Sequence, residues 1–357
     1  MANLFTPLPI REIRLRNRIA VSPMCQYSAV DGMANDWHLV HLGTRAAGGA
    51  GLIIMEATAV SPEGRISVAD LGLWKDEQIQ PLRRITAFLR AQDAVPALQL
   101  AHAGRKGSHS EPWKGGLLLG PADGGWPTVG ASAIPFAPGE RAPEALTPEG
   151  IRRITGSFRS AALRALEAGF LAVEIHAAHG YLLHQFLSPL CNDRTDEYGG
   201  DFPRRSRFLM EVVRTVREVW PERLPLLVRI SCTDWAEGGW TLEDSLSLAL
   251  MLKDAGVDLV DCSSGGILPD IPVPAAPGYQ VPLAAKIRTE ARILTGAVGL
   301  ITLPAQAQAI VTGEKADLVL LGREFLRNPY FPLGAAAELG CEVSWPAPYL
   351  RARRPPP

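Results

Sequence analysis

The sequence predicts a (β/α)8 barrel, in which eight parallel strands form a closed sheet inside a ring of helices. Three observations predict this fold. Short apolar, β-branched runs recur along the chain, amphipathic stretches separate them, and the runs number eight. Eight repeats favour a closed barrel over an open sheet, and 357 residues is an ordinary length for one barrel. We therefore expect residues 1–357 to form a single domain.

The eight expected strands are apolar on both faces, as in the run Leu52-Ile53-Ile54-Met55. Alternating polar residues would instead indicate a sheet with one face in water. Runs without alternation fit strands that helices cover on the outside and that packed side chains cover inside the barrel. In chain order the runs are 19–22, 52–56, 97–100, 172–176, 226–230, 259–262, 293–295 and 318–321.

Amphipathic stretches between the runs predict the helices. The clearest begins at Thr147, which can cap the first turn, and continues with Pro148, which is favoured at a helix start. Similar patterns, each ending near Gly or Pro, follow at 203–220, 242–255 and 302–312.

Two segments depart from this repeat. Residues 108–143, after the third strand, are rich in Gly, Pro and Trp and are too long for an ordinary connection. This extended loop is interpreted either as a lid that faces the substrate or as a solvated insertion. A C-terminal arm, about 345–357, ends in Pro- and Arg-rich sequence and is either a frayed tail or an arm that docks on another subunit.

The composition excludes several classes of partner. With 36 basic and 37 acidic residues, the net charge of −1 provides no general attraction to nucleic acid or to an anionic membrane. No apolar stretch approaches the ~18 residues of a membrane span, so a cytoplasmic location is expected. The five cysteines are scattered without a Cys-x-x-Cys pair, which argues against a disulfide framework, structural zinc or an iron–sulfur cluster.

The residues after the last strands predict a phosphate site. In a barrel of this kind the functional groups lie at the carboxyl ends of the strands. Glycines after the final runs let backbone N–H groups approach a phosphate, and Arg323 beside Gly322 can add a bidentate cation. Each glycine alone is explained equally well by a turn. Three such loops on consecutive strands favour a phosphate-bearing ligand.

His176, His179 and Tyr181 follow the fourth run and form a second candidate cluster. Two imidazoles are good donors to a substrate carbonyl or nitro oxygen, and a tyrosine, with a reference pKa of about 10, can protonate a carbon. A zinc pair and packing histidines are the alternatives, and the sequence offers no convincing third metal ligand. Arg229, in the fifth run, needs an anionic partner, either a ligand or a structural salt bridge.

Longer motifs contain these residues. They are Ser-Pro-Met-Cys-Gln-Tyr at 22–27, Gln-Leu-Ala-His-Ala-Gly-Arg-Lys at 99–106, Glu-Ile-His-Ala-Ala-His-Gly-Tyr at 174–181, Phe-Leu-Ser-Pro-Leu-Cys-Asn-Asp-Arg-Thr-Asp-Glu-Tyr-Gly-Gly at 186–200 and Gly-Arg-Glu at 322–324. Together they resemble the old yellow enzyme family of flavin ene-reductases, in the bacterial thermophilic-like branch that carries a cysteine near the flavin. The resemblance runs almost from end to end.

The resemblance implies that the barrel binds flavin mononucleotide (FMN) non-covalently. The flavin ring would lie against the backbone of Ser22, Pro23 and Met24. Ala57 and Gln99 would lie at the polar edge of the ring.

The remaining flavin contacts are also implied by the resemblance. Arg229 would face N1 and O2, where a positive charge stabilises the anionic reduced flavin. Cys25 would lie near N5 and O4 and would tune the flavin potential by weak hydrogen bonding. Gly299, Gly322 and Arg323 would hold the phosphate.

The activity implied is that of a ping-pong NADPH dehydrogenase or ene-reductase. A nicotinamide, NADPH more than NADH, would reduce the flavin and leave, and an enone, maleimide, nitroalkene or quinone would take its place. His176 and His179 would bind the activating oxygen. Tyr181 would protonate the α carbon, and Tyr27 would contact the substrate. No Gly-x-Gly-x-x-Gly follows a strand, so no separate dinucleotide domain is expected.

In this branch an arginine from one subunit's C-terminal arm completes the neighbour's site, and Tyr349-Leu350-Arg351-Ala352 resembles that arm. Arg351 is the candidate, and a homodimer or a tetramer of dimers is expected. Two other classes of protein compete with this interpretation. A metal-dependent barrel hydrolase or lyase would use His176 and His179, and a phosphate-ligand sensor would bind without turnover.

Overall fold

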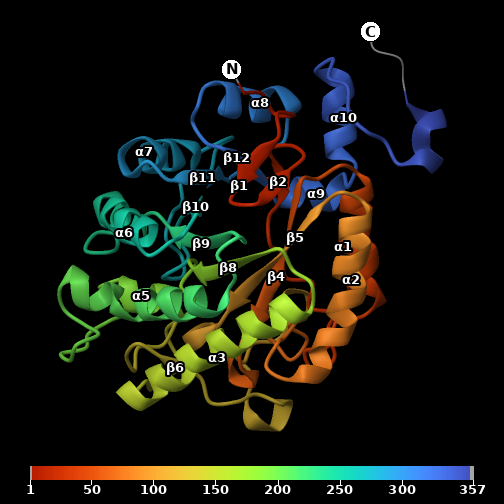
Figure 1. The fold of residues 1–357 in the computed structure, drawn as a ribbon. Coiled ribbons are helices and arrows are strands. Elements are labelled where there is room, and N and C mark those ends of the chain that lie inside the picture. The colour runs from red at the N-terminus through yellow and green to blue at the C-terminus, as the bar shows by residue number, and fades with distance from the viewer. Residues whose placement is uncertain (1, 354–357) are drawn as a thin grey trace.

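The chain forms a closed barrel of eight parallel strands, which confirms the predicted fold class (Figure 1). The structure is a computed structural model, and it describes residues 2–353. The barrel closes where the last strand pairs in parallel with the first. In chain order the strands are β3 (Ile19–Val21), β4 (Leu52–Ala59), β5 (Val95–Ala101), β8 (Ala172–Ala177), β9 (Leu226–Ser231), β10 (Leu259–Ser263), β11 (Leu294–Ala297) and β12 (Leu318–Leu321).

Each of the eight predicted runs coincides with one barrel strand. Two strands are each three residues longer than predicted, because β4 continues through a register shift between Met55 and Ala57, and β5 begins at Val95 and ends at Ala101. Every residue of both strands is buried. Burial on both faces is the reason that these runs lack polar alternation.

Two layers of apolar side chains hold the barrel together. Ile54 and Ala97 belong to a cluster inside the barrel, whereas Ile53 and Leu98 belong to a larger cluster between the strands and the helices. Neighbouring residues alternate between the two clusters because successive side chains of a strand point to opposite faces. The site residues at the strand ends are therefore carried by a rigid, fully packed sheet.

An N-terminal hairpin closes one end of the barrel and lies outside the predicted elements. Its strands, β1 (Leu8–Ile10) and β2 (Ile13–Leu15), pair in antiparallel register. Leu8, Ile10 and Leu15 join the cluster of the barrel interior. The hairpin thus seals the end of the barrel opposite to the carboxyl ends of the strands.

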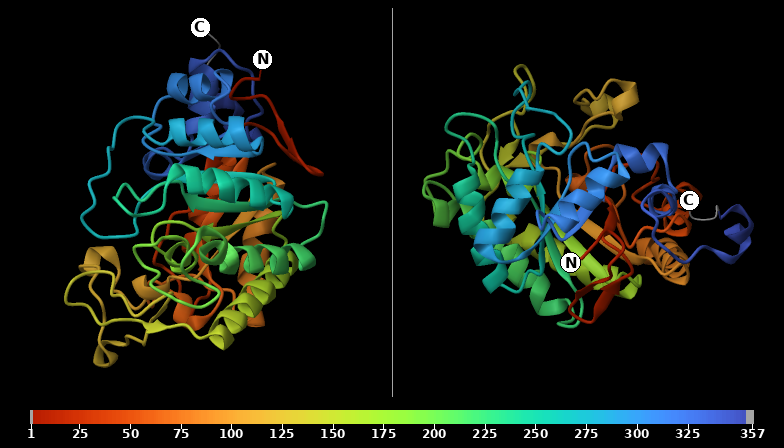
Figure 2. Two further views of the ribbon diagram at one scale, coloured as in Figure 1. Left: turned by 90° about the vertical axis from the view of Figure 1, so that its left-hand side faces the viewer. Right: turned by 90° about the horizontal axis from the view of Figure 1, so that it is seen from above.

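Helices form a ring outside the barrel (Figure 2). At the start of α3, the Thr147 hydroxyl accepts the Gly150 N–H at 3.2 Å and Pro148 occupies the first turn, as predicted. The predicted helices at 203–220, 242–255 and 302–312 correspond to α5, α6 and α8. The helices are α1 (Asp36–Ala47), α2 (Ile79–Ala91), α3 (Pro148–Glu167), α4 (Leu182–Leu187), α5 (Phe202–Val219), α6 (Leu242–Asp254), α7 (Val281–Ala291), α8 (Pro304–Thr312), α9 (Arg323–Arg327) and α10 (Phe331–Glu338).

The extended loop after β5 projects from the barrel in the left view of Figure 2. Two short 3-10 turns, Pro112–Lys114 and Pro121–Asp123, and the strand β6 (Val129–Gly130) interrupt it, and β6 pairs with β7 (Glu144–Ala145). Trp126 anchors the loop, because its Nε1–H donates to the Glu63 carbonyl at 3.0 Å and the Arg65 guanidinium lies 4.9 Å from its ring centroid.

The C-terminal arm leaves α10 and runs along the outside of the molecule (Figure 1). It contains a 3-10 turn, Ala347–Ala352, in which no residue is buried. The last four residues of the predicted arm, 354–357, lie outside the described residues. Among residues 2–353, no helix combines the length and the apolar character that crossing a membrane requires.

Candidate active site

The residues singled out from the sequence gather at one end of the barrel. Ser22 follows β3, while Ala57 lies in β4 and Gln99 in β5. Arg229 lies in β9, and Gly322 follows β12. Because all eight strands are parallel, their carboxyl ends meet at this face.

The loops after β11 and β12 form an open cavity of about 240 Å³. Gly299, Gly322 and Arg323 line it together. Gly299 has a φ of 121°, and a Cβ there would lie 2.9 Å from Gln280 Nε2, so this position requires glycine. Arg323 is exposed and has no carboxylate within 4.0 Å among residues 2–353, whereas its neighbour Arg327 is paired with Glu324 at 2.8 Å. A dianionic group fits this cavity.

The segment after β3 lies beside this cavity. Ser22 is buried and its N–H donates to the Leu321 carbonyl at 3.0 Å, which ties the segment to β12. Met24 is half-buried, and its Sδ lies 3.7 Å from the position that a Gly322 Cβ would take. Residues 22–24 therefore continue the surface that begins at the glycine cavity, and their backbone can lie along a flat ligand.

The buried carboxylate of Glu56, which the sequence analysis did not single out, is hydrogen-bonded to the backbone that follows residues 22–24. Glu56 accepts the Gln26 N–H at 2.8 Å, and its other oxygen lies 3.4 Å from His38 Nε2. His38 Nδ1 accepts the Asn35 N–H at 3.1 Å, which leaves the proton on Nε2, facing Glu56. Burial raises the pKa of Glu56 to about 8. No motif marks this pair, because 18 residues separate its members in the sequence.

Cys25 and Tyr27, which lie on either side of Gln26, are both half-buried. Burial is the main cause that raises the pKa of both groups, so each keeps its proton. Tyr27 has a left-handed φ of 48°. Its ring meets that of Trp113 edge to face, with centroids 5.7 Å apart, and Trp113 is 67% exposed. The extended loop thus reaches the rim of the candidate site.

Arg229 lies in a buried polar wall. Its Nε is 3.1 Å from Asp261 Oδ2, and Glu174 accepts from Gln99 Nε2 at 2.7 Å. Burial, followed by the neighbouring Asp261, raises the pKa of Glu174 to about 8, and burial raises the pKa of Asp261. The guanidinium therefore has the structural salt bridge that the sequence left as one alternative. Its terminal nitrogens have no hydrogen bond among the described residues and remain available to a ligand.

The turn after β8 brings His176, His179 and Tyr181 together. The His176 ring centroid lies 5.2 Å from that of His179 and 5.0 Å from that of Tyr181, and both contacts are edge to face. His179 and Gly180 have left-handed φ angles of 57° and 73°. This turn is tight because a Cβ on Gly180 would lie 2.2 Å from the Gly266 carbonyl oxygen.

The environment of this turn keeps all three side chains neutral. Burial, followed by the charge of Arg229, lowers the pKa of His176 and His179 well below the ordinary value. Burial raises the pKa of Tyr181 well above its ordinary value. The Ala178 N–H donates to His176 Nδ1 at 3.3 Å, which leaves the His176 proton on Nε2. Neutral imidazoles and a protonated phenol are hydrogen-bond donors, which is the state that an oxygen-bearing substrate requires.

Lys106 is a further residue of this site, and the sequence analysis gave it no role. Its Nζ donates to the His179 carbonyl at 2.9 Å and to the Gly266 carbonyl at 3.2 Å. The same nitrogen lies 5.2 Å from the Tyr181 ring centroid. Burial, followed by Arg105, lowers the pKa of Lys106 to about 8. The signal that could have found it is a lysine placed seven residues after Gln99 at the end of a buried strand.

Arg351 lies away from the candidate site of its own chain. It lies in the exposed 3-10 turn of the C-terminal arm, outside the helix ring (Figure 1). The described residues also contain no cluster of three or more His, Cys, Asp or Glu side chains that could hold a metal ion. The zinc interpretation of His176 and His179 therefore lacks a third protein ligand.

Comparisons with known proteins give one consistent result. The model of the NADH:flavin oxidoreductase / NADH oxidase family matches residues 3–341. An NADPH dehydrogenase of Bacillus cytotoxicus is 47% identical over 352 residues, which are 98% of this chain and 96% of that protein. An NADPH dehydrogenase of Listeria monocytogenes serotype 4a is 48% identical over 354 residues, 99% of each chain.

Solved structures show the same relation. Morphinone reductase in complex with tetrahydroNAD matches with a TM-score of 0.79 at 30% identity, over 98% of this chain and 93% of that one. A complex of 2-naphthoyl-CoA reductase with 2-naphthoyl-CoA matches with a TM-score of 0.85 at 26% identity. That match covers 95% of this chain and 52% of the reductase.

Proposed function

This chain belongs to the NADH:flavin oxidoreductase / NADH oxidase family and is an oxidoreductase, and we propose that it is an FMN-dependent ene-reductase driven by NADPH. The relatives named NADPH dehydrogenase support the nicotinamide donor. The fold shared with morphinone reductase supports the reduction of an activated alkene. We propose enones, maleimides, nitroalkenes and quinones as the substrate class, because each pairs an alkene with an activating oxygen.

The residues at the strand ends fit FMN. Gly299, Gly322 and Arg323 would hold the phosphate in the 240 Å³ cavity. The backbone of residues 22–24 would lie along the ring system, and the ring's polar edge would meet the wall that contains Arg229. Bound there without a covalent link, FMN would supply the hydride chemistry, accepting hydride from NADPH and passing it to the β carbon of the alkene.

Ala57, Gln99 and Cys25 complete the proposed cofactor contacts. Ala57 and Gln99 pair across β4 and β5, and the Gln99 amide donates to Glu174, so both residues would lie together at the polar edge of the ring. Cys25 would act as a weak hydrogen-bond partner and not as a nucleophile, because its raised pKa keeps it a thiol.

The two histidines would bind the activating oxygen of the substrate. His176 carries its proton on Nε2, and it offers that donor because Nδ1 is already bonded to the Ala178 N–H. His179 Nε2 lies 2.7 Å from Ser263 Oγ, and when this hydroxyl donates, the His179 proton lies on Nδ1. Two neutral donors stabilise negative charge that develops on a carbonyl or nitro oxygen.

Tyr181 would donate the proton to the α carbon, and Tyr27 would contact the substrate from the rim. The raised pKa of Tyr181 supports this role, because the phenol stays protonated at neutral pH. The observation that carries the proposal is the cluster of His176, His179 and Tyr181 on the barrel face that also bears the phosphate cavity. The ring centroids of His179 and Tyr181 both lie within 5.2 Å of that of His176.

Arg351 would act in a neighbouring subunit. Its exposed arm is free to reach another copy, which fits a homodimer or a tetramer of dimers. Removing residues 349–357 should weaken substrate affinity and dimerisation together. A truncated protein with unchanged KM and unchanged mass in solution would show that the arm takes no part in either.

The proposed reaction has a kinetic test. Initial rates measured at several fixed concentrations of NADPH against cyclohexenone should give parallel double-reciprocal lines, because one site serves both substrates in turn. Intersecting lines would mean that both substrates bind at once, which one shared site does not allow.

A further inference from the structure

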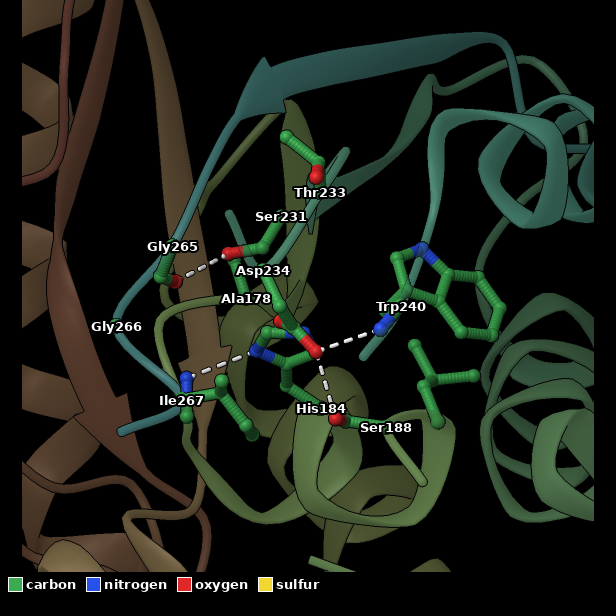
Figure 3. Close-up of polar contacts among 12 residues, drawn as sticks. Ala178, His184, Ser188, Ser231, Thr233, Asp234, Trp240, Gly265, Gly266 and Ile267 are labelled. Carbon is green, nitrogen blue, oxygen red and sulfur yellow. Dashed lines mark hydrogen bonds and ion pairs between the residues drawn. The ribbon is translucent and has the colours of Figure 1, made fainter. Parts of the chain in front are cut away.

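A fully buried histidine–carboxylate pair, drawn in Figure 3, contacts the turn that carries His179 and Tyr181, because the histidine accepts the Gly180 N–H. His184 Nε2 is 3.1 Å from Asp234 Oδ1, and neither side chain is exposed. His184 belongs to α4, which begins immediately after Tyr181, whereas Asp234 follows β9. Neither residue has a role in the function proposed above, yet burying a polar pair is costly unless its hydrogen bonds are satisfied.

His179 and Gly180 are the two left-handed residues of the turn, and the N–H and carbonyl groups of both are hydrogen-bonded to side chains. The His179 N–H donates to Ser231 Oγ at 2.9 Å, and its carbonyl accepts from Lys106 Nζ at 2.9 Å. The Gly180 N–H donates to His184 Nδ1 at 2.9 Å, and its carbonyl accepts from Gln185 Nε2 at 2.8 Å. These residues have no helix or strand partner for the four groups, so the side chains decide their conformation.

His184 can do this only in one tautomer. Because Nδ1 accepts the Gly180 N–H, the imidazole proton must lie on Nε2, and Nε2 faces Asp234. Asp234 is held as an acceptor on its other oxygen, where Ser188 Oγ donates at 2.6 Å and the Trp240 N–H at 2.7 Å. Figure 3 shows both donors bonded to the same oxygen of the Asp234 carboxylate. A carboxylate fixed in this way faces Nε2 at 3.1 Å, which favours the proton on that nitrogen over the opposite tautomer.

We propose that His184 and Asp234 are positioning residues, in which Asp234 fixes the His184 tautomer and His184 holds the Gly180 peptide that sets the directions of His179 and Tyr181. The consequence for catalysis rests on the proposed function, whereas the tautomer and the held peptide do not. Gly180 lies between the two reactive residues, so a rotation of its peptide moves an imidazole and a phenol at once. Displacements of about 1 Å in such groups cost up to roughly 100-fold in rate.

Two substitutions of His184 separate positioning from packing. In His184→Asn, the amide oxygen takes the place of Nδ1 and can still accept the Gly180 N–H. In His184→Gln, the amide can reach Asp234 but leaves the Gly180 N–H without an acceptor. With FMN bound, we expect His184→Gln to slow the reduction of cyclohexenone by the NADPH-reduced enzyme about 10- to 100-fold, and His184→Asn to stay within about threefold of the wild type.

Asp234→Asn tests the tautomer itself. The Trp240 N–H would draw the amide oxygen to its side, which turns the amide N–H groups toward His184 Nε2 and favours the proton on Nδ1, against the Gly180 N–H. The ¹⁵N shifts of the imidazole report this directly. We expect a protonated Nε2 and a bare Nδ1 in the wild type, and a shift of the proton to Nδ1 in the variant, with an alkene reduction rate lowered at least about 10-fold.

Ser188→Ala is the matched control for the loss of one buried polar contact, because the Trp240 N–H still holds the same oxygen of Asp234. We expect its imidazole ¹⁵N shifts to match those of the wild type, and its rate of cyclohexenone reduction to stay within about threefold of the wild-type rate. Equal rates in His184→Asn and His184→Gln, or a wild-type imidazole protonated on Nδ1, would overturn the proposal. So would rate losses that only follow losses in Tm or in FMN affinity. If the wild-type enzyme reduces no alkene, the proposed function fails, and the imidazole shifts still decide whether Asp234 sets the tautomer.

Discussion

The glycine cavity after β11 and β12 and the turn after β8 lie on the same barrel face but are built in opposite ways. The cavity is open and is lined by backbone at Gly299 and Gly322 and by Arg323, which has no carboxylate partner within residues 2–353. The turn is buried, and four side chains hold its backbone, two from the following helix α4 and two, Lys106 and Ser231, from distant segments. An anion can be bound by backbone and one cation at the strand ends, whereas aiming two imidazoles and a phenol needs side chains that hold the backbone between them. Changes in the two regions should therefore have separable effects.

The largest effect is expected for Tyr181→Phe, which should impair alkene reduction and leave FMN reduction intact. Removing the phenol hydroxyl should slow the reduction of cyclohexenone by the NADPH-reduced enzyme about 10²- to 10⁴-fold, the usual contribution of a general acid. Reduction of the bound FMN by NADPH should change little, because no proton from Tyr181 enters that step. Anaerobic stopped-flow absorbance measures both steps separately. An unchanged rate with cyclohexenone would remove Tyr181 as the proton donor.

The opposite result is expected for Arg323→Ala, which should weaken FMN binding and leave turnover intact. Losing a charge-assisted bond to phosphate costs about 1.5–3 kcal/mol, which raises the Kd for FMN by roughly 10- to 150-fold. Quenching of flavin fluorescence during titration of the apoprotein measures this Kd. Turnover per bound FMN should stay near the wild-type value.

Arg327→Ala is the control for this prediction, since Arg327 lines the same cavity but is paired with Glu324. Equal losses of FMN affinity in the two variants would mean that the cavity acts through its general positive charge and not through Arg323.

These differences also explain what the sequence could predict. The eight strands follow from apolar runs, and the glycine cavity follows from glycines placed after consecutive strands. The support of the turn could not be predicted, because His184 and Asp234 are 50 positions apart and only the β8–β9 contact brings them together. The N-terminal hairpin gave no signal because its strands have three residues each and Pro9 interrupts the first. The contact between Tyr27 and Trp113 depends on how the extended loop folds, and no periodic pattern specifies that.

A smaller effect is expected at the rim. Trp113→Ala removes the aromatic contact with Tyr27 and widens access to the site. The KM for bulky apolar alkenes should change about two- to fivefold, in line with the modest worth of an edge-to-face pair, while FMN affinity stays constant. Steady-state kinetics with small and bulky maleimides measure the difference. Equal shifts for both sizes would indicate that the loop has no part in substrate selection.

Titration of His176 and His179 should not change the rate of cyclohexenone reduction as the pH falls from 7.5 to 6. An imidazole of ordinary pKa, about 6.5, would gain a proton across this range. Because burial and Arg229 lower the pKa of His176 and His179, both stay neutral until the pH falls below their lowered values. The rate constant for cyclohexenone reduction should therefore show no inflection near pH 6.5. An inflection there that disappears in His176→Asn would show that the imidazoles titrate normally.

The central claim is that one face of this barrel binds FMN and uses it for both half-reactions. The most direct measurement is the visible spectrum of the purified protein after FMN is added, followed anaerobically by NADPH and then by cyclohexenone. The account predicts a protein-bound flavin band that bleaches with NADPH and returns with cyclohexenone. A protein that retains no FMN, or a bleached band that cyclohexenone leaves unchanged while Tyr181 and both histidines are intact, would contradict it.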